Sequence, residues 1–314
     1  MTTSSQMTHL DSVKARNGSP SHSSMKRRDA LWGYAFVSPQ VLGFLVFVLG
    51  PLIAVVVFSL QDRNLLFGNS GFVGFENYRT MFTTDPLFKK VMVNSLVFTL
   101  LLTPLNVATS LALALLLSRG LRGQKIFRLL YFAPVVTSAA AWAIVWRFLL
   151  QGEQGAVNQM LALIGINGPN WLFEEHWAMV SVVVTRVIKN LGLNMVILLA
   201  AATNVPDEYE EAAVVDGANS WQILWHILLP QLIPSLLFVS IITVIGSLRV
   251  FDHILLLTGG GPGNSTMVLV YYVYYQAFQF FEIGYASALA VILFVVALIL
   301  TVIQWALRSR LGTE

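Results

Sequence analysis

The stretch EYEEAAVVDGANSWQILWHILLP, from Glu208 to Pro230, is an amphipathic segment between two long apolar runs of the chain. It contains four acidic residues and no Lys or Arg. Asn204, just before it, can cap a helix, and the acidic residues that follow favour the positive end of a helix dipole. The letters DGAN then favour a helix end, with Gly217 in a left-handed conformation. Because Ser220 can cap a second helix, the stretch predicts two short helices joined at a glycine elbow.

The composition of the whole chain indicates a membrane protein. Of its 314 residues, 56% are hydrophobic and only 11% are charged, whereas a soluble domain carries about a quarter charged residues. The net charge of +3 does not indicate a nucleic-acid partner, because the basic residues lie at the edges of apolar runs, where they orient a membrane protein. The chain has no cysteine, which excludes disulfides and cysteine-based metal or redox sites.

Six apolar runs are long enough to cross a bilayer, which takes about 20 residues. Each must be helical, because lipid offers the backbone no hydrogen-bond partner. We expect the prolines inside these runs, such as Pro51, Pro104 and Pro134, to kink the helices rather than break them, since neighbouring helices can satisfy the carbonyl groups that proline leaves free. The sequence therefore predicts an all-α membrane protein with six transmembrane helices. The runs cover about 39–60, 91–117, 127–150, 177–202, 231–251 and 284–307.

The distribution of Lys and Arg predicts the orientation of these helices. Basic residues occur before the first run, in the loop after the second and after the last, which lie on one side if there are six spans. The loops near 151–176 and 253–283 on the other side carry none. We therefore expect both termini and the segment 204–230 to be cytoplasmic. The residues on the predicted inner side are Lys26, Arg27, Arg28, Arg119, Arg122, Lys125, Arg128, Arg308 and Arg310, and those opposite are Arg63, Arg79, Lys89 and Lys90.

The N-terminal residues 1–28 are rich in Ser and other polar residues, which predicts a disordered cytoplasmic tail followed by a transmembrane domain over 29–314. The first apolar run is too long for a typical signal-peptide core, and no clear small-residue cleavage site follows it, so we interpret it as a retained span. We find no convincing internal repeat. This argues against a secondary transporter of the kind that is built from inverted repeats.

The fourth and fifth runs carry polar residues at membrane depth. Such groups are costly in lipid and usually face a cavity or a partner, which predicts a substrate pathway for at least some of them. The alternative is interhelical hydrogen bonding, which uses the same residue types. Helical spacing places Arg186, Asn190 and Asn194 on one face of the fourth run. It also places Thr243 and Ser247 on one face of the fifth run. The candidate pathway residues are Arg186, Asn190, Asn194, Thr243, Ser247 and Arg249.

Motifs for catalysis and nucleotide binding are absent from the sequence. The stretch TGGGPGNS, from Thr258 to Ser265, superficially resembles a phosphate-binding loop but lacks its lysine, and no G-x-x-x-x-G-K-[ST] occurs elsewhere. We expect it to form a turn at the outer face. No H-E-x-x-H or G-x-S-x-G occurs, so we do not expect an enzyme.

The central stretch carries a family resemblance. Glu211–Ala213, followed at fixed spacing by Gly217 and Ile227–Pro230, resembles the EAA signature of binding-protein-dependent ABC importer permeases. It lies between the fourth and fifth of six spans, where that family places it. Phe251–Thr266 (FDHILLLTGGGPGNST) and Gly284–Ala290 (GYASALA) are similar to the carbohydrate-uptake branch, which includes the maltose-type membrane subunits.

This resemblance implies a role for each part of the chain. The elbow would be the coupling helix that docks in a groove of an ATPase subunit, and the sugar pocket would fall on the fourth and fifth spans. The implied partners are a second permease subunit, two ATPase subunits that bind ATP, an extracytoplasmic solute-binding protein, and the lipid of a bacterial-type inner membrane. The chain itself would need no cofactor. The implied coupling residues are Glu211, Ala212, Ala213, Asp216 and Gly217.

Two alternatives remain open from the residues. Arg186, Lys189 and Arg249 are more basic than a pocket for a neutral sugar or oligosaccharide needs, so an anionic sugar or sugar phosphate is the alternative substrate. The other explanation of these basic residues is that they pair with Asp252 or snorkel outward. An ion-coupled secondary transporter is the other alternative. It would favour a buried acidic residue inside a span, and the spans have almost none before Asp252.

Overall fold

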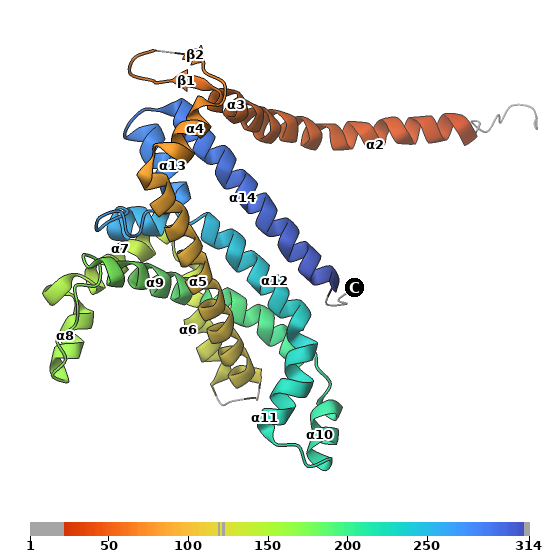
Figure 1. The fold of residues 1–314 in the computed structure, drawn as a ribbon. Helices are drawn as coiled ribbons and strands as arrows, with labels where there is room; N and C mark the ends of the chain where they lie inside the picture. Colours follow the sequence, from red (N-terminus) through yellow and green to blue (C-terminus); the bar gives the residue numbers. More distant parts are fainter. Residues whose placement is uncertain (1–21, 69, 119, 121–122, 311–314) are drawn as a thin grey trace, which may run out of the picture. The chain divides into compact units, whose positions relative to one another are not determined.

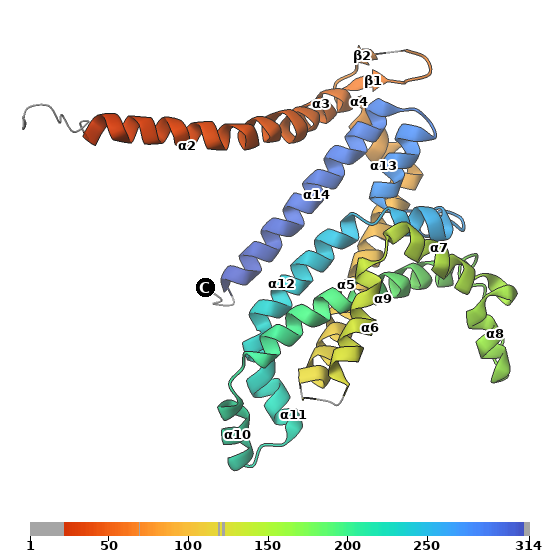
Figure 2. The same cartoon turned by 180° about the vertical axis from the view of Figure 1, so that it is seen from behind.

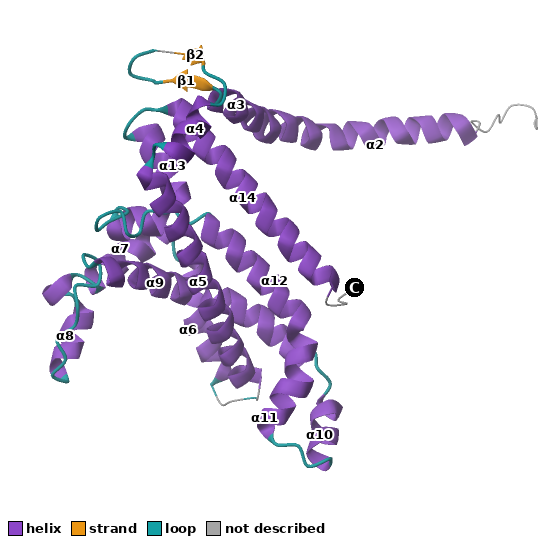
Figure 3. Ribbon diagram, in the orientation of Figure 1, coloured by secondary structure: helices purple, strands orange, loops and turns teal. Residues whose placement is uncertain are grey.

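The structure is a computed structural model that describes residues 22–68, 70–118, 120 and 123–310. Its described residues are mostly helical, as the sequence predicts, with one two-stranded sheet (Figure 3). The chain divides into two compact units, one up to Ala54 and the other from Val55 onward.

The first unit is one long helix with a widened turn. It contains α2 (His22–Phe44), the π-helical turn η1 (Leu45–Leu49) and the start of α3 (Gly50–Ser59). Because a wide turn relieves the clash of a proline ring with the preceding turn, η1 lets the helix continue past Pro51, as predicted. Most of the predicted tail lies outside the described residues. Its last part, 22–28, is already helical because it contains no proline or glycine, so the helix begins before the predicted boundary.

The second unit holds the remaining apolar helices (Figures 1 and 2). Counting Leu31–Ser59 of the first helix, the described residues contain five helices that are long and apolar enough to span a membrane, and six if a bent pair counts as one span. Within this unit, α5 packs against α9 and α12. Pro104 lies inside α5 without breaking it, as expected. The helices are α5 (Pro86–Ser118), α6 (Gln124–Val136), α7 (Ala139–Leu149), α9 (Glu175–Thr203), α12 (Leu229–Leu248) and α14 (Ile283–Arg310).

The bent pair, α6 and α7, corrects one prediction. The third apolar run is broken rather than kinked, because the chain turns by 103° after Pro134, at the extended residues Thr137 and Ser138. A lysine of α9 explains why this break is tolerated. The ammonium group of Lys189 donates hydrogen bonds to the carbonyl oxygens of Pro134 and Thr137, both at 2.7 Å, and so satisfies backbone groups that the ended helix leaves free.

A glycine sets how closely α9 and α6 approach. A Cβ atom added to Gly192 would lie 2.1 Å from the carbonyl oxygen of Tyr131 and 2.8 Å from Cα of Phe132, so the two backbones are in direct contact. Such contact through a small residue is typical of helices that associate in membranes, where close packing replaces the hydrophobic effect.

Short elements gather where α5 and α14 begin. A half-buried acid joins them: Asp85 accepts hydrogen bonds from the hydroxyl groups of Tyr272, at 2.6 Å, and Tyr285, at 2.5 Å. This network ties α13 and α14 to the start of α5. The short elements at this end of the unit are β1 (Gln61–Arg63), which pairs antiparallel with β2 (Ser70–Phe72), α4 (Glu76–Thr83) and α13 (Leu269–Phe278). Elsewhere in the unit lie η2 (Gly152–Gln154), α8 (Ala156–Leu163) and η4 (Ile254–Thr258).

The glycine-rich stretch from Thr258 to Ser265 forms a turn, as the sequence predicts. Four of its residues, Gly259, Gly260, Gly263 and Asn264, have positive φ angles, which glycine and asparagine adopt most easily. The turn is anchored to α5 through two side chains. Lys90 donates to the carbonyl oxygen of Gly263 at 2.7 Å, and the amide of Asn94 donates to that of Asn264 at 2.8 Å.

Candidate functional site

The elbow between α9 and α12 consists of two helices around a glycine. Helix α10 spans Asp207–Val215, and α11 spans Ser220–Ile223. Between them Gly217 has a φ of 83°, with no atom near enough to contact an added Cβ, so its left-handed backbone alone requires glycine. The predicted two-helix elbow is thus confirmed.

The helix caps differ from the prediction. Asn219, not Ser220, caps α11: its side chain accepts from the backbone N–H of Gln222, whose side chain accepts from the N–H of Asn219 in return. This reciprocal pair is stronger than a serine cap alone. Asn204 ends α9 instead of capping α10, because Pro206 holds the cap position of α10 in an extended conformation.

The second helix of the elbow does not stop at Pro230. It continues through the π-helical turn η3 (Leu224–Leu228) into α12, so that Ser220–Leu248 is one span. As at η1, this wide turn lies just before a proline, here Pro230, and it accommodates the backbone N–H group that proline lacks. Any movement of the elbow is therefore transmitted directly along α12.

The predicted coupling residues lie on the surface of the elbow, with one exception. Glu211, Ala212, Asp216 and Gly217 are exposed, whereas Ala213 is buried. Val215, which is not among the predicted coupling residues, is the most exposed large apolar residue of the elbow, with an exposed fraction of 86%. The neighbouring exposed residues are Val214, Trp221 and Trp225, and the last two form an edge-to-face aromatic pair with ring centroids 5.6 Å apart. A surface with both carboxylates and large apolar groups is typical of a docking site for another protein.

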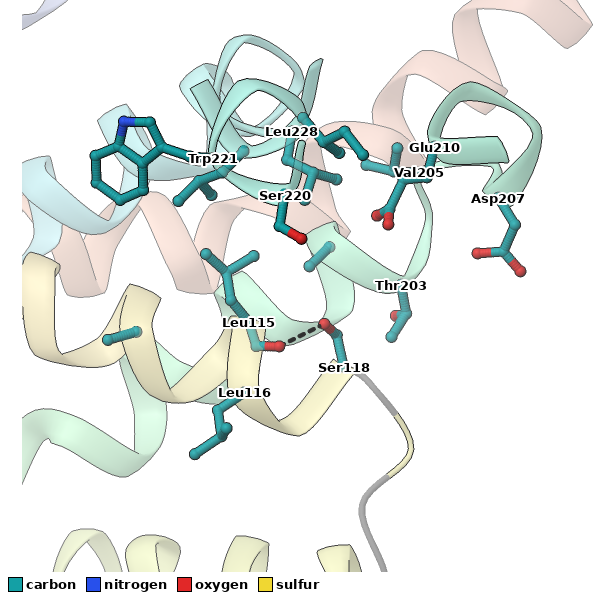
Figure 4. Close-up of a pocket in the computed structure, with 14 residues that line it drawn as sticks. Leu115, Leu116, Ser118, Thr203, Val205, Asp207, Glu210, Ser220, Trp221 and Leu228 are labelled. Carbon is teal, nitrogen blue, oxygen red and sulfur yellow. Dashed lines mark hydrogen bonds between the residues drawn. The ribbon is translucent and has the colours of Figure 1, made fainter. Parts of the chain in front are cut away.

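A cavity of about 790 Å³ separates the elbow from the ends of α5 and α9. Its walls are mainly apolar, and two carboxylates of α10, Asp207 and Glu210, line one side (Figure 4). Leu115 and Leu116 come from α5 on the opposite side.

Polar residues join the middle of three helices, α5, α9 and α12. The amide of Asn194 donates to the side-chain oxygen of Asn106 and to Thr243 Oγ1, the latter at 3.2 Å. A second contact, 2.8 Å long, joins Thr99 Oγ1 to Ser247 Oγ. We call these five residues the polar seam. All of them are buried, so three of the predicted pathway residues, Asn194, Thr243 and Ser247, are engaged in the interhelical bonding that the alternative interpretation described.

Two members of the seam, both on α5, are not among the predicted pathway residues. Thr99 and Asn106 lie seven residues apart, which places them on the same face of a helix. This spacing inside an apolar run was a usable signal, of the same kind as the one on the fourth run.

The other predicted pathway residues are not part of the seam. Arg186 and Asn190 are half-buried on α9, and within the described part of the chain the side chain of Asn190 has no hydrogen bond and Arg186 Nε has no acceptor. Arg249 is exposed and lies just after the end of α12. Neither arginine forms an ion pair with Asp252, since the described residues contain one ion pair, Arg79 with Glu76 at 3.6 Å. Arg186 and Asn190 therefore remain available to a ligand.

The chain can now be compared with known proteins. Residues 86–313 match the family described as the inner membrane component of binding-protein-dependent transport systems. The chain belongs to this family. The predicted EAA elbow, the helical membrane fold and the absence of enzymatic activity agree with this membership, and an ion-coupled secondary transporter finds no support.

Several members of the family are similar over nearly their whole length. The chain is 34% identical to the arabinooligosaccharides transport system permease protein AraP of Bacillus subtilis, over 90% of each chain. It is 33% identical to the lactose transport system permease protein LacF of Rhizobium radiobacter, over 92% of this chain and 98% of that one. Among solved structures, a chain of a bacterial alginate ABC transporter, crystallised with an alginate-bound periplasmic protein, superposes with a TM-score of 0.80 at 25% identity, over 92% of this chain and 97% of that one. The protein is thus a multi-pass permease subunit of an ABC importer.

Proposed function

We propose that this permease imports a sugar or an oligosaccharide. The observation that carries the proposal is its similarity to AraP, a permease for arabino-oligosaccharides, over 90% of both chains. The half-buried polar groups on α9 support it, because Arg186 and Asn190 offer hydrogen-bond donors that have no partner among the described residues, in a setting where such groups are costly.

The substrate pathway runs along the faces of α9 and α12. Arg186, Asn190 and Arg249 would contact the substrate directly. Asn194, Thr243 and Ser247 are buried in the seam and would reach it only when the helices separate. The importer cycles between conformations, and a seam of a few hydrogen bonds, each worth about 0.5–1.5 kcal/mol net, is weak enough to open.

The working transporter contains further subunits. We propose a second permease subunit, two ATPase subunits that bind ATP, and an extracytoplasmic solute-binding protein. The elbow docks on one ATPase subunit through Glu211, Ala212, Asp216 and Gly217, with Ala213 packing behind them. Because Ser220–Leu248 is continuous, closure of the ATPase subunits on ATP moves the elbow and with it α12.

A pathway variant tests the proposal. Asn190→Leu should lower the affinity for substrate about tenfold or more, because it removes hydrogen bonds worth about 1–2 kcal/mol. The readout is ATP-driven uptake of labelled oligosaccharides by proteoliposomes that contain the whole complex. The control is Leu193→Ala, on an exposed face of the same helix, and it should leave uptake unchanged.

The charge of the substrate is tested in the same assay with Arg186→Gln. One similar structure is that of an importer of the acidic polysaccharide alginate, which supports an anionic sugar as the alternative substrate. A larger loss of uptake for a uronate oligosaccharide than for a neutral one would assign Arg186 to a carboxylate. Normal uptake of all sugars by both variants would contradict the proposed pathway.

We propose that both termini and the elbow face the cytoplasm, in the inner membrane of the cell. The described basic residues Lys125 and Arg128 lie at the start of α6, next to the elbow end of α5, in keeping with the bias of basic residues toward the cytoplasm. The chain has no cysteine, so single cysteines report position without background. A cysteine at Gln124 should react with an impermeant thiol reagent only from the inside, and one at Asn167, an exposed residue of the loop before α9, only from the outside. Labelling of both from the same side would contradict this topology.

A further inference from the structure

A groove of about 340 Å³ lies between the start of α5 and the first turns of α9. One end of the groove is polar, with Lys90 and Asn94 from α5 and Glu175 and His176 from α9. Deeper along both helices its walls are apolar. The apolar residues are Val97, Leu101, Met179 and Val180, and all except Met179 are exposed.

The groove lies where two spans enter the membrane. Lys90 and Glu175 are among the last charged residues before the apolar parts of α5 and α9 begin. Charged groups at this position mark the level of the lipid headgroups, and the apolar residues one to three turns further lie at the level of acyl chains. A phospholipid has the same order of polar and apolar parts along the membrane normal.

The charges in the groove are paired with neither each other nor any other described side chain. Glu175 and Lys90 form no ion pair, although both reach Gly263 of the glycine-rich turn. The ammonium group of Lys90 uses one donor on the carbonyl oxygen of Gly263 and has two more to offer. The hydroxyl oxygen of Ser265, which also lines the groove, is buried and has no hydrogen-bond partner within the described part of the chain.

We propose that this groove binds a phospholipid with a phosphoethanolamine headgroup. Lys90 binds the phosphate, and Glu175 accepts hydrogen bonds from the primary ammonium group. The hydroxyl group of Ser265 donates a hydrogen bond to the phosphate or accepts one from the ammonium group. One acyl chain lies along Val97 and Leu101. A choline headgroup has no N–H donor for Glu175, and the groove has no ring of aromatic residues to hold a quaternary ammonium instead. A headgroup with only a negative charge would leave Glu175 unpaired beside it. The volume is near the lower end of small-ligand pockets, about 300–1,000 Å³, so it fits a headgroup rather than a whole lipid.

Native mass spectrometry of the purified, delipidated complex tests the proposal with three lipids of equal chain length, phosphatidylethanolamine, phosphatidylcholine and phosphatidylglycerol. We expect phosphatidylethanolamine to bind about tenfold more tightly than the other two, the effect of about one charged hydrogen bond. Lys90→Ala should weaken the binding of all three lipids, because Lys90 binds the phosphate group that they share. Lys89→Ala is the matched control, because Lys89 is exposed on the same turn but does not line the groove, and it should bind like the wild type.

A second variant guards against a local folding defect in Lys90→Ala. Glu175→Gln keeps the size of the side chain and should weaken binding of phosphatidylethanolamine while strengthening that of phosphatidylglycerol. Equal binding of the three lipids by the wild type, or the same lipid preference in Glu175→Gln, would overturn the proposal. A disulfide between a cysteine at Leu101 and one in the second permease subunit would also overturn it, since a protein surface would then cover the groove.

Discussion

Replacing Gly192 with leucine should prevent the permease from folding to its native helix packing. The added Cβ alone would lie 2.1 Å from the carbonyl oxygen of Tyr131, and the contact is with backbone atoms that cannot rotate away. Overpacking usually costs about 1–3 kcal/mol, and a clash between two backbones exceeds that range because α6 and α9 must separate. Their separation would also remove the bonds of Lys189 to Pro134 and Thr137, which stabilise the break between α6 and α7.

The expected result is a loss of folded protein rather than a loss of activity alone. Gly192→Leu should yield no monodisperse complex after extraction in mild detergent, and Gly192→Ala should lower the midpoint of thermal unfolding. Gly246→Ala is the matched control, because Gly246 lies inside α12 with no atom within 4 Å of an added Cβ. There alanine should be neutral or stabilise the helix by about 0.5–1 kcal/mol. Normal yield and normal thermal stability of Gly192→Leu would show that the two helices are not in contact as described.

The elbow could be predicted because its signals are local. Gly217 needs a left-handed backbone, and the acidic residues before it suit a helix start, so neither depends on distant parts of the chain. The cap at Asn219 also has a local signal, because Asn219 and Gln222 have the spacing of a capping box, although the neighbouring Ser220 is a cap candidate too.

The break between α6 and α7 could not be predicted in the same way. Its stabilising group, the ammonium of Lys189, is 55 residues from Pro134 and 52 from Thr137 along the chain. A proline in an apolar run predicts only that a carbonyl group loses its partner, and whether the helix bends or breaks depends on which donor the fold supplies. In the sequence, Lys189 shows only that the fourth span is basic, and its bonds to backbone oxygens explain why a cation is tolerated there.

The candidate pathway was predictable as a set of residues but not as an arrangement. Periodicity placed Asn190 and Asn194 on one face of α9, yet only Asn194 reaches the seam while Asn190 stays free. Helical spacing defines a face about a third of the circumference wide, and the neighbours that fill it decide which residues are satisfied. Asn194 is satisfied because its amide donates a hydrogen bond to the side-chain oxygen of Asn106 on α5.

Charge reversal at the elbow should abolish transport without unfolding the protein. Glu211 is exposed, and its side chain has no hydrogen bond or ion pair among the described residues, so Glu211→Lys should change the free energy of unfolding by no more than about 0.5 kcal/mol. At an interface the same change places a cation where the partner is built for an anion, and like-charge contacts there cost several kcal/mol. Glu211→Gln, which removes the charge without reversing it, should have a smaller effect.

Gly217→Val should abolish uptake for a different reason. There is open space around Gly217, so valine meets no steric barrier, but a β-branched residue at a φ of 83° strains the backbone by about 1 kcal/mol or more and turns α10 away from its direction. Gly217→Asn is the control, because asparagine tolerates the left-handed region, and it should keep most of the activity.

Each variant complex is purified, and its subunit stoichiometry, ATP-driven uptake and stimulation of ATP hydrolysis by the binding protein are measured. We expect Glu211→Lys to lose the ATPase subunit and Gly217→Val either to lose it or to hydrolyse ATP without transport. If both variants kept wild-type uptake and stimulation, the elbow would be a connecting loop, and α12 would have to receive its movement from elsewhere.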